Sequence, residues 1–187
     1  MSTMPVRIQP LAPEEFTPEQ AELVGDWTHL VFSRVMIRNP RMYRTFVTGF
    51  LTEVIARTGL PPRDRQIVCV RMLELCGEVY ELTHHLLISE RTGLNKEEAE
   101  AMRYGEGASL TDWDRTVIAA VEDIYNDQQI SEGVWKALAK NYTQEQLIEL
   151  VCLAGCYQTM AMLTKSFGME LEPPGVFESF NQIRKYK

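Results

Sequence analysis

The 187-residue chain lacks several features that mark common classes of protein. Lysine and arginine total 19 against 26 aspartates and glutamates, which gives a formal net charge of −7. Without a cationic excess to pair with phosphates, nucleic acid is not an expected partner. No apolar run comes near the roughly 20 residues of a membrane span, so no membrane partner is expected either. The Pro-rich start, with its acidic pair Glu14-Glu15, is unlike a signal peptide and favours a cytoplasmic protein.

Closely spaced cysteine pairs are also missing. The four cysteines are Cys69, Cys76, Cys152 and Cys156, and none forms a C-x-x-C. Structural zinc sites use such pairs, so no metal site is predicted. In a chain without a secretory signal, we expect reduced thiols that are mostly buried.

The period-two alternation of strands does not stand out, whereas helix start signals recur along the chain. They predict an all-α protein, a single compact multi-helix domain with short loops. We expect an N-terminal arm with helices over residues 1–38, a helical domain over 39–173 and a C-terminal tail over 174–187. The start signals are Thr17, Asn39, Asn95, Thr111, Ser131 and Thr143.

Chemistry-bearing side chains concentrate in the ten residues that end at His85. On a helix, residues three and four apart share a face, so Glu78, Glu81 and His85 form one polar ridge. Tyr80 and His84 form a neighbouring ridge. Two of the chain's three histidines lie in this segment. The segment is therefore the leading candidate for a functional site.

Gly77 predicts a helix break, which places Glu78 in the first turn of a new helix. A carboxylate on the same face orients an imidazole and raises its pKa, so His85 is expected to act as a general acid or base near neutral pH. A solvated or interface ridge has the same pattern. Glu81 and His84 also match the E-x-x-H of di-iron bundles, but a second such motif is needed and His29 is the only other histidine.

These residues carry a resemblance to a known family. The run Tyr80-Glu-Leu-Thr-His-His85, followed by Gly93-Leu94 and Glu97-Glu98, resembles the Y-E-W-x-x-H…G-L-s-x-e-e pattern of the carboxymuconolactone decarboxylase family, which includes the alkylhydroperoxidase D-like proteins. The resemblance covers roughly residues 40–173. It implies an all-helical oligomer, commonly a homotrimer or homohexamer, with the motif helix beside a pocket near subunit contacts. Further similar segments are Leu110–Arg115, Trp135–Leu138, Gln146–Val151 and Gly155–Tyr157.

The peroxidase branch of that family carries a motif that resembles E-x(11)-C-x-x-C-x-x-x-H. Counting back from His85, its cysteine positions hold Glu81 and Glu78, and its upstream glutamate position holds Gln66. Without a thiolate at either position, a peroxidase or peroxiredoxin-type antioxidant activity is a disfavoured alternative. Cys76 is the one nearby thiol that could act in its place.

The decarboxylase branch keeps Y-E-W-x-x-H, and this chain differs from it by Leu82 in place of the tryptophan. That resemblance implies a reaction without metal or organic cofactor, in which a carboxylate leaves as carbon dioxide and an acid protonates the dienolate. His85 and Glu81 would be the acid/base pair, and Glu78 or Tyr80 would assist.

His84 is assigned to substrate binding with Tyr80, or to a subunit contact. A substrate carboxylate also needs a cationic anchor, and the candidates nearby in sequence are Arg65, Arg71 and Arg91. The sequence therefore predicts a lyase or isomerase for a small, carboxylated ring compound. A non-catalytic helical oligomer that binds a ligand is the other alternative.

Overall fold

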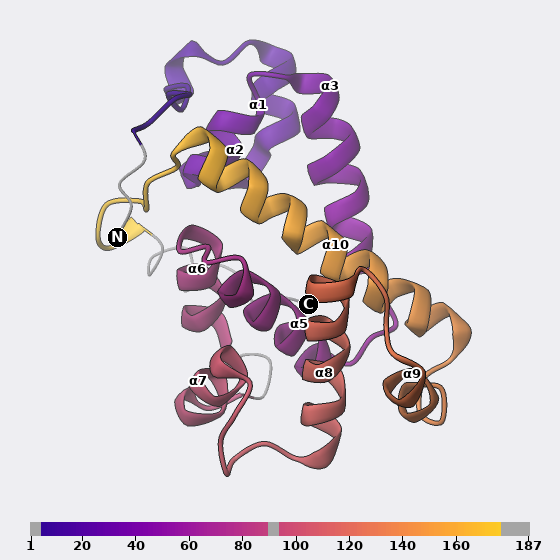
Figure 1. The fold of residues 1–187 in the computed structure, drawn as a ribbon. Coiled ribbons are helices and arrows are strands. Elements are labelled where there is room, and N and C mark those ends of the chain that lie inside the picture. Colours follow the sequence, from indigo (N-terminus) through magenta and orange to yellow (C-terminus); the bar gives the residue numbers. More distant parts are fainter. Residues whose placement is uncertain (1–4, 90–93, 177–187) are drawn as a thin grey trace. The chain divides into compact units, whose positions relative to one another are not determined.

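The structure is a computed structural model that describes residues 5–89 and 94–176. Within these ranges every regular element is a helix, which confirms the predicted all-α class (Figure 1). The chain divides into two compact units, Met1–Thr52 with Leu163–Lys187 and Glu53–Met162. This boundary lies inside a continuous helical stretch, whereas the sequence predicted a boundary near residue 38.

The first unit is built from short helices. Thr17 starts α1 with the predicted capping box, because its hydroxyl accepts from Gln20 N while the Gln20 side chain accepts from Thr17 N. Tyr43 is fully buried, and its hydroxyl lies 3.3 Å from Ser33 Oγ. The elements are η1 (Pro13–Glu15), α1 (Pro18–Val24), η2 (Gly25–His29), α2 (Val31–Met36), α3 (Pro40–Met42) and the π-helix η3 (Tyr43–Leu51).

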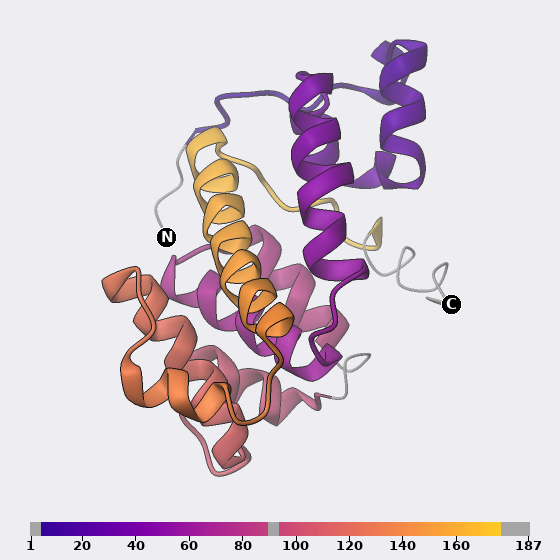
Figure 2. The same ribbon diagram turned by 90° about the vertical axis from the view of Figure 1, so that its right-hand side faces the viewer.

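The second unit is organised around α5 (Pro62–Leu75), which packs against α6 (Tyr80–Ile88), α7 (Lys96–Tyr104) and α8 (Asp112–Asp127). Figure 2 shows this group from another side. As predicted, α5 is buried on more than one face, since its core side chains are inaccessible to solvent. They are Ile67, Val68, Val70, Met72 and Leu73. The remaining elements are α4 (Thr52–Ala56), α9 (Glu132–Leu138) and most of α10 (Gln144–Phe167).

Capping boxes explain where several of these helices start. Asn95, Thr111 and Thr143 each accept from the backbone N–H three residues later, as predicted. Ser131 differs: its side chain makes no cap bond, and its backbone N–H instead donates to Asp123 Oδ2 at 2.8 Å. A side chain at the end of α8 thus fixes the start of α9.

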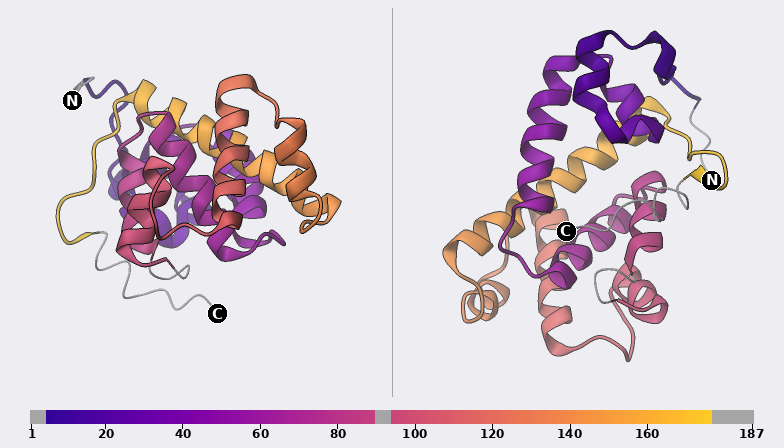
Figure 3. Two further views of the ribbon diagram at one scale, coloured as in Figure 1. Left: turned by 60° about the horizontal axis from the view of Figure 1, so that its bottom comes forward. Right: turned by 180° about the vertical axis from the view of Figure 1, so that it is seen from behind.

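The helix α10 is an exception to the expectation that no apolar stretch approaches a membrane span (Figure 3). Its 24 residues are long and apolar enough by length and composition, with a mean hydropathy of 1.5 in the most apolar window. Half of that window is buried inside the structure. A core helix meets the same criteria, so this feature is weak evidence for a membrane.

Candidate functional site

The candidate site begins at the junction between α5 and α6. Gly77 has a φ of +58°, a left-handed conformation that favours glycine. The N–H of Gly77 donates to Glu74 O, and that of Glu78 donates to Leu73 O, both at 2.9 Å. These two bonds form a Schellman motif, which ends α5 and confirms the predicted break.

Glu78 caps α6 from outside the helix. Its Oε1 accepts from Tyr80 N at 2.9 Å, and its Oε2 accepts from Glu81 N at 2.8 Å and from Leu82 N at 3.1 Å. Because the turn at Gly77 takes up one residue more than expected, α6 starts at Tyr80 and Glu78 precedes it. The prediction that Glu78 lies in the first turn, on one face with Glu81 and His85, is therefore wrong. Both carboxylate oxygens of this 1% exposed residue hold backbone donors.

His85 is buried between α5 and α10. Its Nδ1 lies 3.0 Å from Gln66 Oε1 on α5, and its ring meets Tyr157 of α10 edge-on, with 4.9 Å between ring centroids. The other end of the Gln66 amide contacts the backbone of α6: Nε2 donates to His85 O at 2.6 Å and to Ser89 Oγ at 3.1 Å. Ser89 Oγ in turn donates to His85 O at 2.7 Å. Gln66 therefore contacts both the ring and the main chain of His85.

Burial dominates the protonation of His85. Loss of solvent, followed by the charge of neighbouring His84, lowers the pKa of His85 from its ordinary value to about 3. The sequence predicted a raised pKa, and that prediction is wrong, because the cost of charging a ring that is 7% exposed outweighs any gain from a carboxylate. At neutral pH, His85 is the uncharged imidazole.

Glu81 is half-buried and lies one turn before His85. Burial and then the charge of Glu81 raise the pKa of the Cys156 thiol to about 12. Burial likewise raises the pKa of Cys69 and of Tyr157, with Glu81 contributing to both. The Glu81 carboxylate therefore acts on side chains of α5 and α10 that surround His85.

Tyr80 and His84 form the second predicted ridge, and both are buried. Their rings meet edge-on, with centroids 4.5 Å apart and an interplanar angle of 75°. The two ridges thus lie within the protein, which does not fit a solvated surface. The assignment of Tyr80 and His84 to substrate binding stays a prediction.

The arginines proposed as anchors have structural partners. Arg65 Nη1 donates to Ile55 O. Arg71 pairs with Glu122 at 2.6 Å and donates to Arg103 O at 2.7 Å. Arg91 lies outside the described residues. A carboxylated substrate would have to compete for Arg65 and Arg71 with these contacts.

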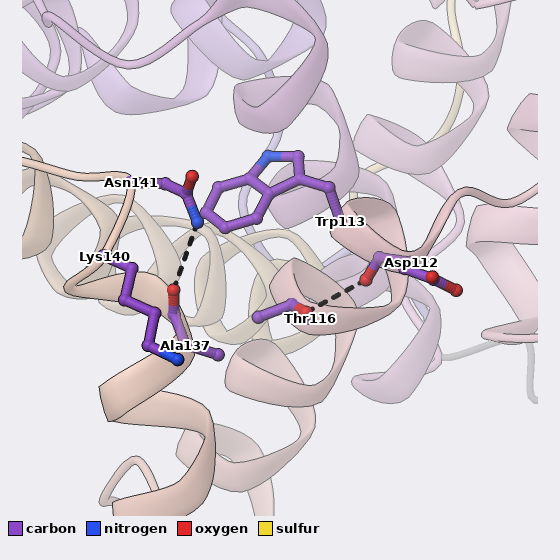
Figure 4. Close-up of a pocket in the computed structure, with 6 residues that line it drawn as sticks. All are labelled: Asp112, Trp113, Thr116, Ala137, Lys140 and Asn141. Carbon is purple, nitrogen blue, oxygen red and sulfur yellow. Dashed lines mark hydrogen bonds between the residues drawn. The ribbon is translucent and has the colours of Figure 1, made fainter.

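A pocket of about 360 Å³ lies elsewhere in the second unit, between the start of α8 and the end of α9 (Figure 4). None of the predicted site residues lines it. Figure 4 shows Asn141 beside the Trp113 indole, with Lys140 farther away next to Ala137. The lining residues are Asp112, Trp113, Thr116, Ala137, Lys140 and Asn141.

Behind this pocket lies a polar cluster that the sequence did not reveal. Asp64 is 3% exposed, and its Oδ2 accepts from Tyr142 Oη at 2.5 Å and from Trp113 Nε1 at 3.1 Å. The Trp113 and Tyr142 rings meet edge-on, with centroids 5.0 Å apart. A carboxylate in the first turn of a helix predicted to be deeply buried was the available signal, because a buried carboxylate requires donors.

Metal-binding side chains do not gather at the ridge. Among the described residues, no three His, Cys, Asp or Glu side chains are arranged to hold a metal ion. The E-x-x-H spacing of Glu81 and His84 therefore has no additional ligands in that part of the chain.

Comparison with known proteins agrees with the resemblance. Residues 40–123 match the model of the Carboxymuconolactone decarboxylase family. Over these residues the chain is similar to that family. The match spans Gln66, the α5–α6 junction and all of α6, so each predicted site residue lies inside it.

Solved structures share the fold of this chain. An uncharacterised peroxidase-related protein from Silicibacter sp. TM1040 aligns over 94% of this chain and 93% of its own, with a TM-score of 0.73 and 12% identity. A protein of unknown function from Agrobacterium tumefaciens, described as a candidate antioxidant defence protein AhpD, aligns over 73% and 94%, with a TM-score of 0.66 and 15% identity. At these identities the likeness shows the fold alone. No curated protein sequence matches this chain.

Proposed function

We propose that this protein is a cofactor-independent acid/base enzyme, a lyase or isomerase that acts on a small ring compound. The proposal rests on one observation: Glu81 lies one helical turn from a buried, uncharged His85 that Gln66 and Tyr157 hold in place. A carboxylate beside an ordered imidazole can move a proton to and from carbon without a metal or an organic cofactor.

The two side chains have different roles. Burial lowers the pKa of His85 to about 3, which favours the uncharged ring at pH 7, so His85 is not assigned as the acid that protonates carbon. Glu81 is the proton carrier. In an isomerisation it takes a proton from carbon, leaving the electron pair in an enolate, and returns the proton to another carbon. In a decarboxylation, the carbon–carbon bond breaks, carbon dioxide leaves, and protonated Glu81 delivers its proton to the dienolate.

Thiol chemistry is less well supported. Burial raises the pKa of Cys69 and, to about 12, that of Cys156, so neither is a thiolate at neutral pH. Cys76 is half-buried, and its Sγ lies 3.9 Å from Met72 Sδ. If the protein consumes peroxide and a Cys76→Ser variant does not, the peroxidase alternative replaces our proposal.

Hydrogen–deuterium exchange into small lactones and enones tests the proposal. In D₂O, the wild type should exchange the acidic C–H of at least one such compound, and Glu81→Gln should slow this by about 100-fold or more. The matched control is Glu145→Gln at an exposed position of α10, which should exchange at the wild-type rate. Equal rates for the wild type and Glu81→Gln would overturn the role of Glu81.

A second candidate function is ligand binding without catalysis. It is favoured by one observation: the 360 Å³ pocket contains no ridge residue, while His85 is 7% exposed. Binding of a ring compound that perturbs Trp113 fluorescence, with no exchange into that compound, would support it.

We also propose that the protein is a homo-oligomer, a trimer or hexamer, as the family resemblance implies. Support comes from exposed apolar side chains on α10: Ile148 is 64% exposed, Val151 44% and Met162 57%. Apolar side chains grouped on one helix are a common feature of subunit contacts. Light scattering should give three or six times the 21.5 kDa chain mass, and Ile148→Glu should lower it.

A further inference from the structure

We propose that Gln66 is a positioning residue that fixes His85 as the Nδ1–H tautomer, so that Nε2 is its hydrogen-bond acceptor. The consequence, which rests on the proposed function, is that the site recognises ring compounds through a hydroxyl or enol O–H donor. A carbonyl oxygen is an acceptor and could not pair with that nitrogen.

The orientation of the Gln66 amide follows from its surroundings. One end lies 2.6 Å from His85 O, a backbone carbonyl that can only accept. Were the amide reversed, two oxygens would face each other at that distance. The nitrogen must therefore be at this end, and Oε1 must face the imidazole.

The tautomer of His85 follows from the amide. Oε1 of Gln66 can only accept, and it lies 3.0 Å from His85 Nδ1. That nitrogen therefore carries the proton, and in an uncharged imidazole the other nitrogen is then the acceptor. Ser89 keeps the arrangement consistent, because its hydroxyl donates to His85 O and receives from Gln66 Nε2.

The groups around His85 favour the uncharged ring. Gln66 of α5 is neutral, and Tyr157 of α10 is a phenol whose pKa burial raises well above its ordinary value. On α6, a charge on His84 would repel a charge on His85. A glutamine, unlike a glutamate, orients the ring without adding a negative charge that would attract a second proton.

Nitrogen NMR of ¹⁵N-histidine-labelled protein reads the tautomer directly. The chain has only three histidines, so His29→Gln, His84→Gln and His85→Gln variants assign the signals. From about pH 5 to about pH 8, His85 Nδ1 should be protonated and Nε2 unprotonated. An Nε2–H tautomer, or an imidazolium at neutral pH, would overturn the proposal.

Two variants separate positioning from general structural support. Gln66→Leu removes the acceptor, so the Nδ1–H signal should give way to the Nε2–H tautomer that free histidine prefers. Gln66→Glu keeps an oxygen acceptor at this place, so Nδ1 should stay protonated, and its added negative charge should raise the pKa of His85. Gln144→Glu, the same change at an exposed residue, should alter nothing. An unchanged tautomer in Gln66→Leu, or an unprotonated Nδ1 in Gln66→Glu, would contradict the role of Gln66.

The substrate class is tested with a matched pair of probes, 4-hydroxybenzoate and its methyl ether 4-methoxybenzoate. The hydroxyl compound should shift the Nε2 resonance of His85 and the ether should not. Equal shifts, including none, would overturn the donor preference. Because the tautomer is measured without turnover, an absence of exchange activity would count against the proposed function and leave the role of Gln66 standing.

Discussion

The second unit contains two buried polar clusters that are built in opposite ways. In one, a titratable ring, His85, is held by the uncharged amide of Gln66 and packs edge-on against Tyr157. In the other, a carboxylate, Asp64, is held by the donors of two aromatic side chains. Tyr142 and Trp113 only donate hydrogen bonds to the Asp64 carboxylate, whereas Gln66 determines which nitrogen of His85 can accept a hydrogen bond. The first arrangement orients an uncharged imidazole, and the second fixes a carboxylate in the core.

The clusters also differ in their access to solvent. Trp113 of the Asp64 cluster lines the 360 Å³ pocket, whereas none of the residues around His85 does. The pocket and the proposed proton carrier Glu81 therefore do not coincide. The pocket has titratable side chains of its own, Asp112 and Lys140.

The largest effect is expected from Asp64→Ala. The change leaves the Tyr142 hydroxyl and the Trp113 N–H without their acceptor in a buried place, which should lower the free energy of unfolding by about 3 kcal/mol. Chemical denaturation measures this. Asp64→Asn, which keeps one acceptor oxygen, should lose less. If the clusters are independent, His85 keeps its tautomer in both variants, and a changed tautomer would show that they are coupled.

Glu78→Ala should have the next largest effect and lower the free energy of unfolding by about 2 kcal/mol. Three backbone N–H groups at the start of α6 would lose their acceptor. Denaturation and exchange activity should be measured together. Our assignment of Glu78 to capping predicts lower stability with residual exchange; unchanged stability with abolished exchange would instead restore its predicted catalytic role.

Local signals in the sequence predicted much of the fold. Thr17, Asn95, Thr111 and Thr143 start helices as expected, because a capping box involves only four consecutive residues. The π-helix from Tyr43 to Leu51 was not predicted, since a wider helical turn leaves no distinct pattern in the residues.

The sequence predicted that Glu81 and His85 lie on one helix, but it did not predict the direction in which the pKa of His85 shifts. Helical spacing and the family motif brought Glu81 and His85 together on α6. The pKa of His85 depends on burial by α5 and α10. The residues of these helices that contact its ring, Gln66 and Tyr157, are 19 and 72 residues away in the sequence. Spacing within one helix carries no information on such burial, so the direction of the shift was predicted wrongly.

Lowering the pH from 7 to about 5 should reduce the free energy of unfolding by about 1 to 2 kcal/mol through His85. Folding lowers the pKa of His85 to about 3, so between this value and about 6.5 the unfolded chain binds more protons. This contribution is complete above about pH 6.5 and is lost as the pH falls, by at most about 1.4 kcal/mol per pH unit. His85→Gln should therefore flatten the loss of stability between pH 7 and about pH 5. His29→Gln, in the other unit, should leave the slope unchanged. An unaltered slope in His85→Gln would mean that the pKa of His85 is the same in the folded and the unfolded chain.

The smallest effect is expected at the pocket itself. Lys140 is exposed where it lines the pocket, so Lys140→Ala should change the free energy of unfolding by less than about 0.5 kcal/mol and leave exchange at the wild-type rate. Lys136→Ala, one turn earlier and paired with Glu132 at 2.9 Å, is the matched control. Loss of hydrogen–deuterium exchange activity in Lys140→Ala alone would mean that the pocket holds the substrate. The proposed assignment of catalysis to the His85 cluster, and of a structural role to the Asp64 cluster, would then be wrong.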